Sequence, residues 1–135
     1  MADTISTQII QDGGRQAIIK VTAVVGNTDV VTSTMVDVST LSVDPVSRRP
    51  CTSVVLAKLV YVGVGVGVKL EWDATANVLI FDLPVNWTEE YDFSAFSGIP
   101  NNAGTGKTGD IVATTVSPTT GDTYTFIFTV NKQYG

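Results

Sequence analysis

The chain has 135 residues, and its 13 acidic and 8 basic side chains give a formal net charge of −5 at pH 7. Histidine is absent and Cys51 is the single cysteine, which excludes Ser-His-Asp catalysis, His-ligated zinc and an internal disulfide. The acidic balance argues against binding to nucleic acid or to anionic membranes. We therefore expect one domain over residues 1–135 that is not an enzyme and holds no metal or cofactor.

Valine and threonine dominate the composition, with 21 and 19 residues. β-Branched side chains favour strands over helices, and apolar residues at alternate positions are typical of antiparallel sheets with one wet face. Such runs predict strands over residues 5–11, 16–25, 29–38, 53–59, 60–73, 77–83, 110–116 and 123–131. About eight strands with Gly, Asn and Asp between them predict an all-β, antiparallel, jelly-roll-like β-sandwich with little or no helix.

The N-terminal residues 1–8 are interpreted as an extended arm, because chain ends are free unless something ties them down. We expect no secretory signal here, because residues 1–4 have neither a positive nor an apolar stretch. Residues 53–70 are apolar, but Lys58, three glycines and the alternation favour a soluble strand over a membrane span.

Residues 42–52 form the first of two long irregular stretches, and they contain Arg48 and Arg49, the strongest local positive charge. The simplest interpretation is a solvated loop. The alternative is that the two guanidinium groups pair with carboxylates on a neighbouring chain, since arginine binds carboxylates in a bidentate manner. Cys51 is expected to be buried and unreactive.

Residues 60–73 are interpreted as one extended strand with valines on one face and Gly63, Gly65 and Gly67 on the other. Glycine weakens a strand, so three on one face require a close approach or a strong bend. A partner chain on that face and packing against the strand's own sheet are equally open.

Residues 84–109 form the second irregular stretch, with a short helical turn expected within residues 86–96. Its aromatic residues are Trp87, Tyr91, Phe93 and Phe96. They could stack on sugar rings, or anchor the loop on this domain or on a neighbouring subunit. We favour anchoring, because aromatic residues carry large burial energies. Residues 104–109 resemble part of a phosphate-binding loop, but the pattern's first glycine is replaced by Asn101 and a strand follows, so a flexible loop is expected.

Short segments spread over most of the chain resemble small virion structural proteins of tailed bacteriophages. These segments are DGGR (12–15), AIIK (17–20), VDVSTL (36–41), KLVY (58–61), VKLEWDA (68–74), DF (92–93), GI (98–99), KTGDI (107–111) and TYTFI (123–127). None of them is a chemical motif, so the resemblance transfers no catalytic residue.

The resemblance implies a capsid decoration, or cement, protein: a β-sandwich on the outer shell that stabilises it by bridging neighbouring major capsid subunits. It implies self-association, with a trimer favoured, and a location on the capsid surface after synthesis in the host cytoplasm. Candidate contacts are residues 1–8, the loop around Arg48 and Arg49, and residues 87–96. The alternatives are a neck or tail component of the virion, and a carbohydrate-binding or host-adhesion module.

Overall fold

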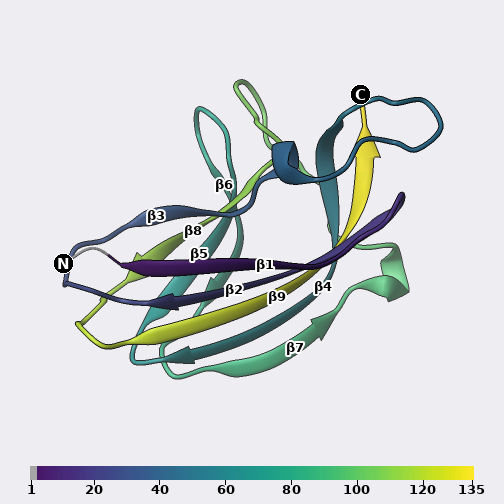
Figure 1. Cartoon of the computed structure of the whole chain (residues 1–135). Helices are drawn as coiled ribbons and strands as arrows, with labels where there is room; N and C mark the ends of the chain where they lie inside the picture. Colours follow the sequence, from purple (N-terminus) through teal and green to yellow (C-terminus); the bar gives the residue numbers. More distant parts are fainter. Residues whose placement is uncertain (1–2) are drawn as a thin grey trace.

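The computed structural model describes residues 3–135, which form nine strands and two single-turn 3-10 helices (Figure 1). The strands are β1 (Thr4–Asp12), β2 (Gln16–Val24), β3 (Thr32–Val36), β4 (Cys51–Val64), β5 (Gly67–Trp72), β6 (Val78–Leu83), β7 (Thr88–Asp92), β8 (Ile111–Val116) and β9 (Thr123–Tyr134). The helical turns are η1 (Val38–Thr40) and η2 (Ser94–Phe96).

The strands pair into two antiparallel sheets, one in the order β1-β2-β9-β4-β7 and the other in the order β3-β8-β5-β6. With β1 set aside, the remaining eight strands follow the two interlocked Greek keys of a jelly roll. The strand β1 extends the larger sheet by one strand at its edge. The prediction of an all-β, antiparallel sandwich is confirmed, with nine strands where about eight were expected.

The core lies between the two sheets and is centred on β9, which pairs with β2 on one side and β4 on the other. Tyr124, Phe126 and Phe128 alternate along β9 and are buried on the inner face. The rings of Phe126 and Phe128 stack with centroids 5.1 Å apart, and Tyr61 of β4 packs on Phe126 at 4.9 Å. Burial of apolar surface is the dominant favourable contribution to folding, and these large rings supply a substantial part of it.

The prediction of one strand over residues 60–73 is wrong. The chain turns at Gly65, whose φ is +81°, so β4 ends at Val64 and β5 begins at Gly67 in the other sheet. The turn also reverses which positions face inward. Tyr61 is fully buried and Val64 is 57% exposed before it, whereas Val68 is fully buried after it.

The expectation of a helical turn within residues 86–96 is correct only for residues 94–96 of η2. Residues 88–92 instead form β7, which pairs with β4 from Val62↔Thr88 to Lys58↔Asp92. The backbone of β4 offers a row of hydrogen-bonding groups there, and pairing with it outweighs the weak local preference for a helix.

The expectation of an extended arm over residues 1–8 is wrong for the residues from Thr4 onward. Thr4 to Gln8 belong to β1 and pair in regular register with β2 (Figure 1). Residues 1–2 lie outside the described part of the chain.

Candidate interaction surfaces

The loop at residues 42–50 projects from one end of the sandwich and is organised by Asp44. The Asp44 carboxylate accepts hydrogen bonds from Val46 N (3.2 Å) and Ser47 Oγ (2.5 Å). Its backbone N–H donates to Arg49 O, and its carbonyl accepts from Arg48 N, both at 2.9 Å. The bonds from Ser47 and Val46 hold the pKa of this carboxyl below its usual value. The loop therefore has one defined shape before it meets any partner.

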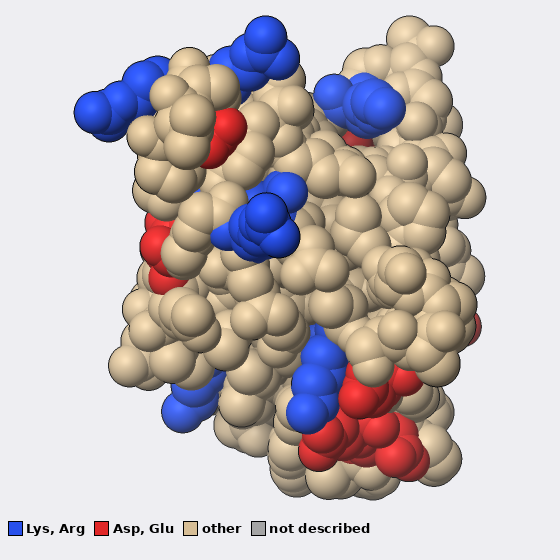
Figure 2. All heavy atoms as spheres, turned by 90° about the vertical axis from the view of Figure 1, so that its right-hand side faces the viewer, with Lys and Arg blue, Asp and Glu red and all other residues tan. Residues whose placement is uncertain are grey.

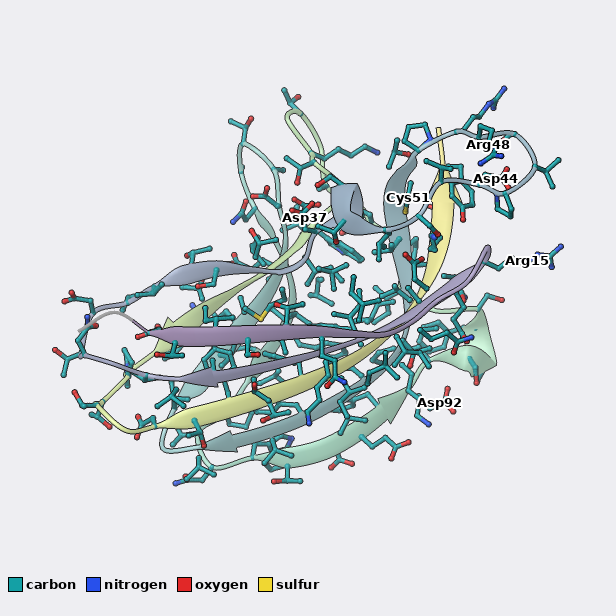
Figure 3. All side chains as sticks on the ribbon, in the orientation of Figure 1. Arg15, Asp37, Asp44, Arg48, Cys51 and Asp92 are labelled. Atoms are coloured by element: carbon teal, nitrogen blue, oxygen red, sulfur yellow. The ribbon has the colours of Figure 1, made fainter. Side chains whose placement is uncertain are left out.

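The three arginines of the chain gather at this end of the molecule. Arg48 and Arg49 lie in the projecting loop, Arg15 lies in the turn between β1 and β2, and all three are exposed. Figure 3 shows the Arg15 side chain extending away from the sandwich and places Arg48 on the projecting loop, near Asp44. Val46, which is 90% exposed, lies beside them. We call Arg15, Val46, Arg48 and Arg49 the arginine end.

Figure 2 looks onto this end and shows an uneven distribution of charge. Blue Lys and Arg side chains stand out over its upper half, red acidic side chains concentrate at one lower corner with a blue side chain against them, and smaller red areas lie toward the left. The two ion pairs within residues 3–135, Lys58–Glu90 and Lys132–Asp12, both use lysine. Pairing of Arg48 and Arg49 with a neighbouring chain stays a prediction.

A buried lysine fixes the base of the arginine end. Lys132 Nζ, on β9, donates to Asp12 Oδ1 (2.7 Å), Ser42 Oγ (2.9 Å) and Gly13 O (3.0 Å). The Lys132 side chain is fully buried, and the Tyr134 ring lies 5.5 Å from its ammonium group. These contacts tie the β1–β2 turn, the start of the projecting loop and β9 together. An open groove of about 890 Å³ runs between the same three segments.

The Lys132 contact was missed at the level of sequence, although a signal for it exists. Inward-facing residues occupy the even positions of β9, and Lys132 continues that series after Val130. An alternation that places a lysine on a core face predicts a buried ion pair, because an unpaired buried charge is strongly unfavourable.

The aromatic residues of the second irregular stretch, Trp87, Tyr91, Phe93 and Phe96, lie on one side of the sandwich, where β6 and β7 form the sheet edges. Tyr91 and Phe93 stack on Phe81 with centroid distances of 5.2 and 5.5 Å. Phe96 packs against Phe93 at 6.0 Å but is 62% exposed. Trp87 Nε1 donates to Tyr91 Oη at 3.0 Å, and Trp87 is 40% exposed. Tyr91 and Phe93 thus anchor on their own domain, while Trp87 and Phe96 reach the surface.

The three glycines predicted to share one face do not do so, because the turn at Gly65 separates them. Gly63 faces the core, where the Tyr61 ring lies so close that a Cβ would be 2.1 Å from Tyr61 Oη. Gly67 begins β5, and a Cβ there would lie 3.2 Å from Leu83 O. The space beside Gly63 is filled by the chain itself, which removes the physical reason for placing a partner there.

The two remaining sequence features, Cys51 and the loop at residues 104–109, are held by contacts within the domain. Cys51 is buried, its Sγ donates to Ser53 O at 3.4 Å, and burial raises the pKa of its thiol. In the loop at residues 104–109, Thr108 Oγ1 donates to Asp73 Oδ2 at 2.8 Å, and β8 follows. Within residues 3–135, no group of three or more Cys, Asp or Glu side chains is placed to hold a metal ion. In the same part of the chain, no helix has the length and apolarity needed to cross a bilayer.

A scan against protein-family models, a search of curated proteins and a search of solved structures each found no match.

Proposed function

We propose that the chain is a capsid decoration protein of a tailed bacteriophage, which stabilises the shell by bridging neighbouring major capsid subunits. The observation that carries this proposal is the jelly-roll order of strands β2 to β9. Jelly rolls form viral capsid domains as well as lectin domains. The order therefore supports the virion role that the resemblance of the sequence segments implies.

The arginine end is the surface that we assign to the capsid contact. Arginine pairs with carboxylates through two parallel hydrogen bonds, and Arg48 and Arg49 are held on a loop that Asp44 has already ordered. Because the loop needs little further ordering, less conformational entropy is lost on binding. When each bridging molecule binds the shell at two or more points, weak contacts of this kind combine into tight attachment.

The test is sedimentation of the purified chain with undecorated capsid shells. We expect the chain to pellet with the shells and to raise the temperature at which they break open. Arg48→Glu together with Arg49→Glu should reduce attachment. The control is Lys20→Glu together with Lys69→Glu, which changes the net charge equally at positions in the middle of β2 and in β5. A wild-type chain that stays in the supernatant at low ionic strength contradicts the proposal, and attachment to necks or tails instead supports the alternative virion position.

A carbohydrate-binding role is the second candidate, and the exposure of Trp87 favours it. Trp72, the other tryptophan, is 1% exposed whereas Trp87 is 40% exposed. If the chain binds carbohydrate through this side chain, added sugars should change the fluorescence of Trp87 alone, and Trp87→Phe should abolish the change. A saturable change would support adhesion. If the capsid proposal is correct, we expect no saturable change with host-surface glycans.

A further inference from the structure

The two sheets have four edge strands, and three of them carry features that discourage pairing with another chain. Strand β7 displays Glu89, Glu90 and Asp92. Strand β6 is followed at once by Pro84, and β3 is only five residues long. Charge, proline and short length are the usual means by which proteins block edge-to-edge association.

The fourth edge, β1, has none of these features over its regular part. It is nine residues long, and its sequence TISTQIIQD carries no charge before Asp12. The register with β2 is regular from Thr4 to Ile9, and a bulge appears only beyond Ile9. Most of the strand is exposed. An uncharged, regular, exposed edge is a template for strand addition.

The hydrogen bonds at the two ends of β2 establish which way its backbone groups point. Arg15 O accepts from Lys132 N at 2.7 Å, and Val25 N donates to Asp122 O at 2.8 Å. The odd-numbered residues of β2 therefore direct their N–H and C=O groups toward β9. These directions alternate along an antiparallel strand. The even-numbered residues of β2 therefore direct their backbone N–H and C=O groups toward β1.

The register then gives the direction of each backbone group in β1. Ser6 and Gln8 lie opposite even-numbered residues of β2 and are bonded to it. Ile5, Thr7 and Ile9 lie opposite odd-numbered residues, so their N–H and C=O groups point to the open edge. These three residues offer the donors and acceptors that an added strand would use.

The sequence around Thr7 is close to a palindrome, Ile5-Ser6-Thr7-Gln8-Ile9. If β1 pairs antiparallel with a second β1 about Thr7, then Thr7 meets Thr7, Ile5 meets Ile9, and Ser6 meets Gln8. The isoleucines then lie apolar against apolar on the inner side of the sheet. Ile9 is 42% exposed there, beside a hollow of about 270 Å³ that opens between β1 and β3. A second strand would cover it.

We propose that β1 pairs with β1 of a second copy of the chain, about a two-fold axis at Thr7, to join two five-stranded sheets into one. The added strand is β1 of a second copy because, in this register, the outward backbone N–H and C=O groups of one copy meet those of the other, and like side chains meet like. An isologous contact closes with two copies, so it gives a dimer, whereas the resemblance favoured a trimer. The proposal is independent of the capsid role.

Sedimentation equilibrium of the full-length chain tests it. We expect the apparent mass to rise with concentration toward twice 14.3 kDa, with little dependence on salt because the contact holds no charge. Thr7→Pro should raise the dissociation constant about tenfold or more, since it removes the central outward N–H of each copy. That N–H makes no bond to β2, so the folded monomer tolerates the change. Thr7→Lys, which places like charges together, is the second variant.

The control is Glu89→Lys on the opposite edge of the same sheet, which should leave the dimer intact, while circular dichroism verifies that each variant is folded. Amide hydrogen exchange gives a further measure. Protection of Ile5, Thr7 and Ile9 should appear only at concentrations that form the dimer, whereas Ser6 and Gln8 should be protected throughout. A wild-type chain that stays monomeric up to its solubility limit, forms a trimer, or dimerises equally well as Thr7→Pro and Thr7→Lys overturns the proposal.

Discussion

The Tyr61 phenol covers Gly63 two residues further along β4, on the inner face of the larger sheet. Tyr61 Oη donates to Val66 O at 3.3 Å. Burial, with a smaller contribution from Tyr124, raises the pKa of Tyr61 to about 12. An aromatic ring that lies over a glycine in a sheet supplies the packing that the glycine lacks. The pair therefore explains why glycine is required at this position.

Gly63→Ala should destabilise the fold by about 2 kcal/mol, because the added methyl group would lie 2.1 Å from Oη of the fully buried Tyr61 and force that ring to shift. Urea unfolding measures the change. The matched control is Gly104→Ala, where an added Cβ has no neighbour within 4 Å and the effect should stay within about 0.5 kcal/mol. Equal effects at the two sites would contradict the packing argument.

Asp12→Ala should lower the free energy of unfolding by about 2 kcal/mol, because it leaves the buried Lys132 ammonium with only the Gly13 and Ser42 oxygens. Glu90→Ala is the comparison. It removes an ion pair of the same 2.7 Å length whose side chains are exposed, and exposed pairs contribute little. Thermal unfolding of both variants checks the contrast. The double variant Asp12→Ala with Lys132→Met removes the unpaired ammonium and should be more stable than Asp12→Ala alone. If it is not, the loss of the ion pair is not the cause of the destabilisation.

The same ion pair predicts an acid-dependent loss of stability. Burial opposes ionisation of Asp12, but the hydrogen bonds from Lys132 and Ser42 outweigh it and hold the pKa of the carboxyl below 3.8. Its stabilising contribution is therefore complete above pH 3.8 and is lost as the pH falls through the lower pKa of the folded state. The melting temperatures of wild type and Asp12→Asn should differ at pH 7 and converge in strong acid. A difference that does not depend on pH would refute this.

The charge of Asp110 should have the opposite effect to that of Asp12 and lower the stability of the folded state. Burial raises the pKa of its carboxyl, and the nearby Asp37 and Asp73 add to the effect against the hydrogen bond from Val38 N. A raised pKa means that the folded state is disfavoured as the pH rises from 3.8 through the folded-state value. Asp110→Asn keeps an oxygen for Val38 N and removes the charge. Its melting temperature at pH 7 should therefore exceed that of wild type by about 2 °C, and a decrease would count against this account.

Much of the sandwich could be predicted from the sequence because packing against one face leaves a period of two. The runs that became β2 and β9 show this most clearly, since their inward residues are buried. The turn at Gly65 could not be predicted in the same way. Valines stand at every second position on both sides of it, so the alternation continues through a change of sheet. Strand β7 was missed because Glu89 and Glu90 have weak strand preference, and tertiary pairing with β4 decides its conformation.

The candidate surfaces were predictable to different degrees. The exposure of Arg48 and Arg49 follows from charge and proline content, and the structure adds the bonds by which Asp44 shapes the loop. Neither the assembly of Arg15 with that loop nor the free edge at Thr7 could be predicted. Both depend on which strands become neighbours, and the alternation of apolar residues predicts strands but not their order in a sheet.

The position of β9 has a consequence for biosynthesis. It follows β1 to β8 along the chain, yet it lies between β2 and β4 at the centre of its sheet. The two earlier strands have no central partner until β9 has been synthesised, and pairing over such long sequence separations is slow. The larger sheet therefore closes only when β9 is available, and a chain truncated before β9 leaves the pairs β1–β2 and β4–β7 unjoined, with their inner apolar faces exposed.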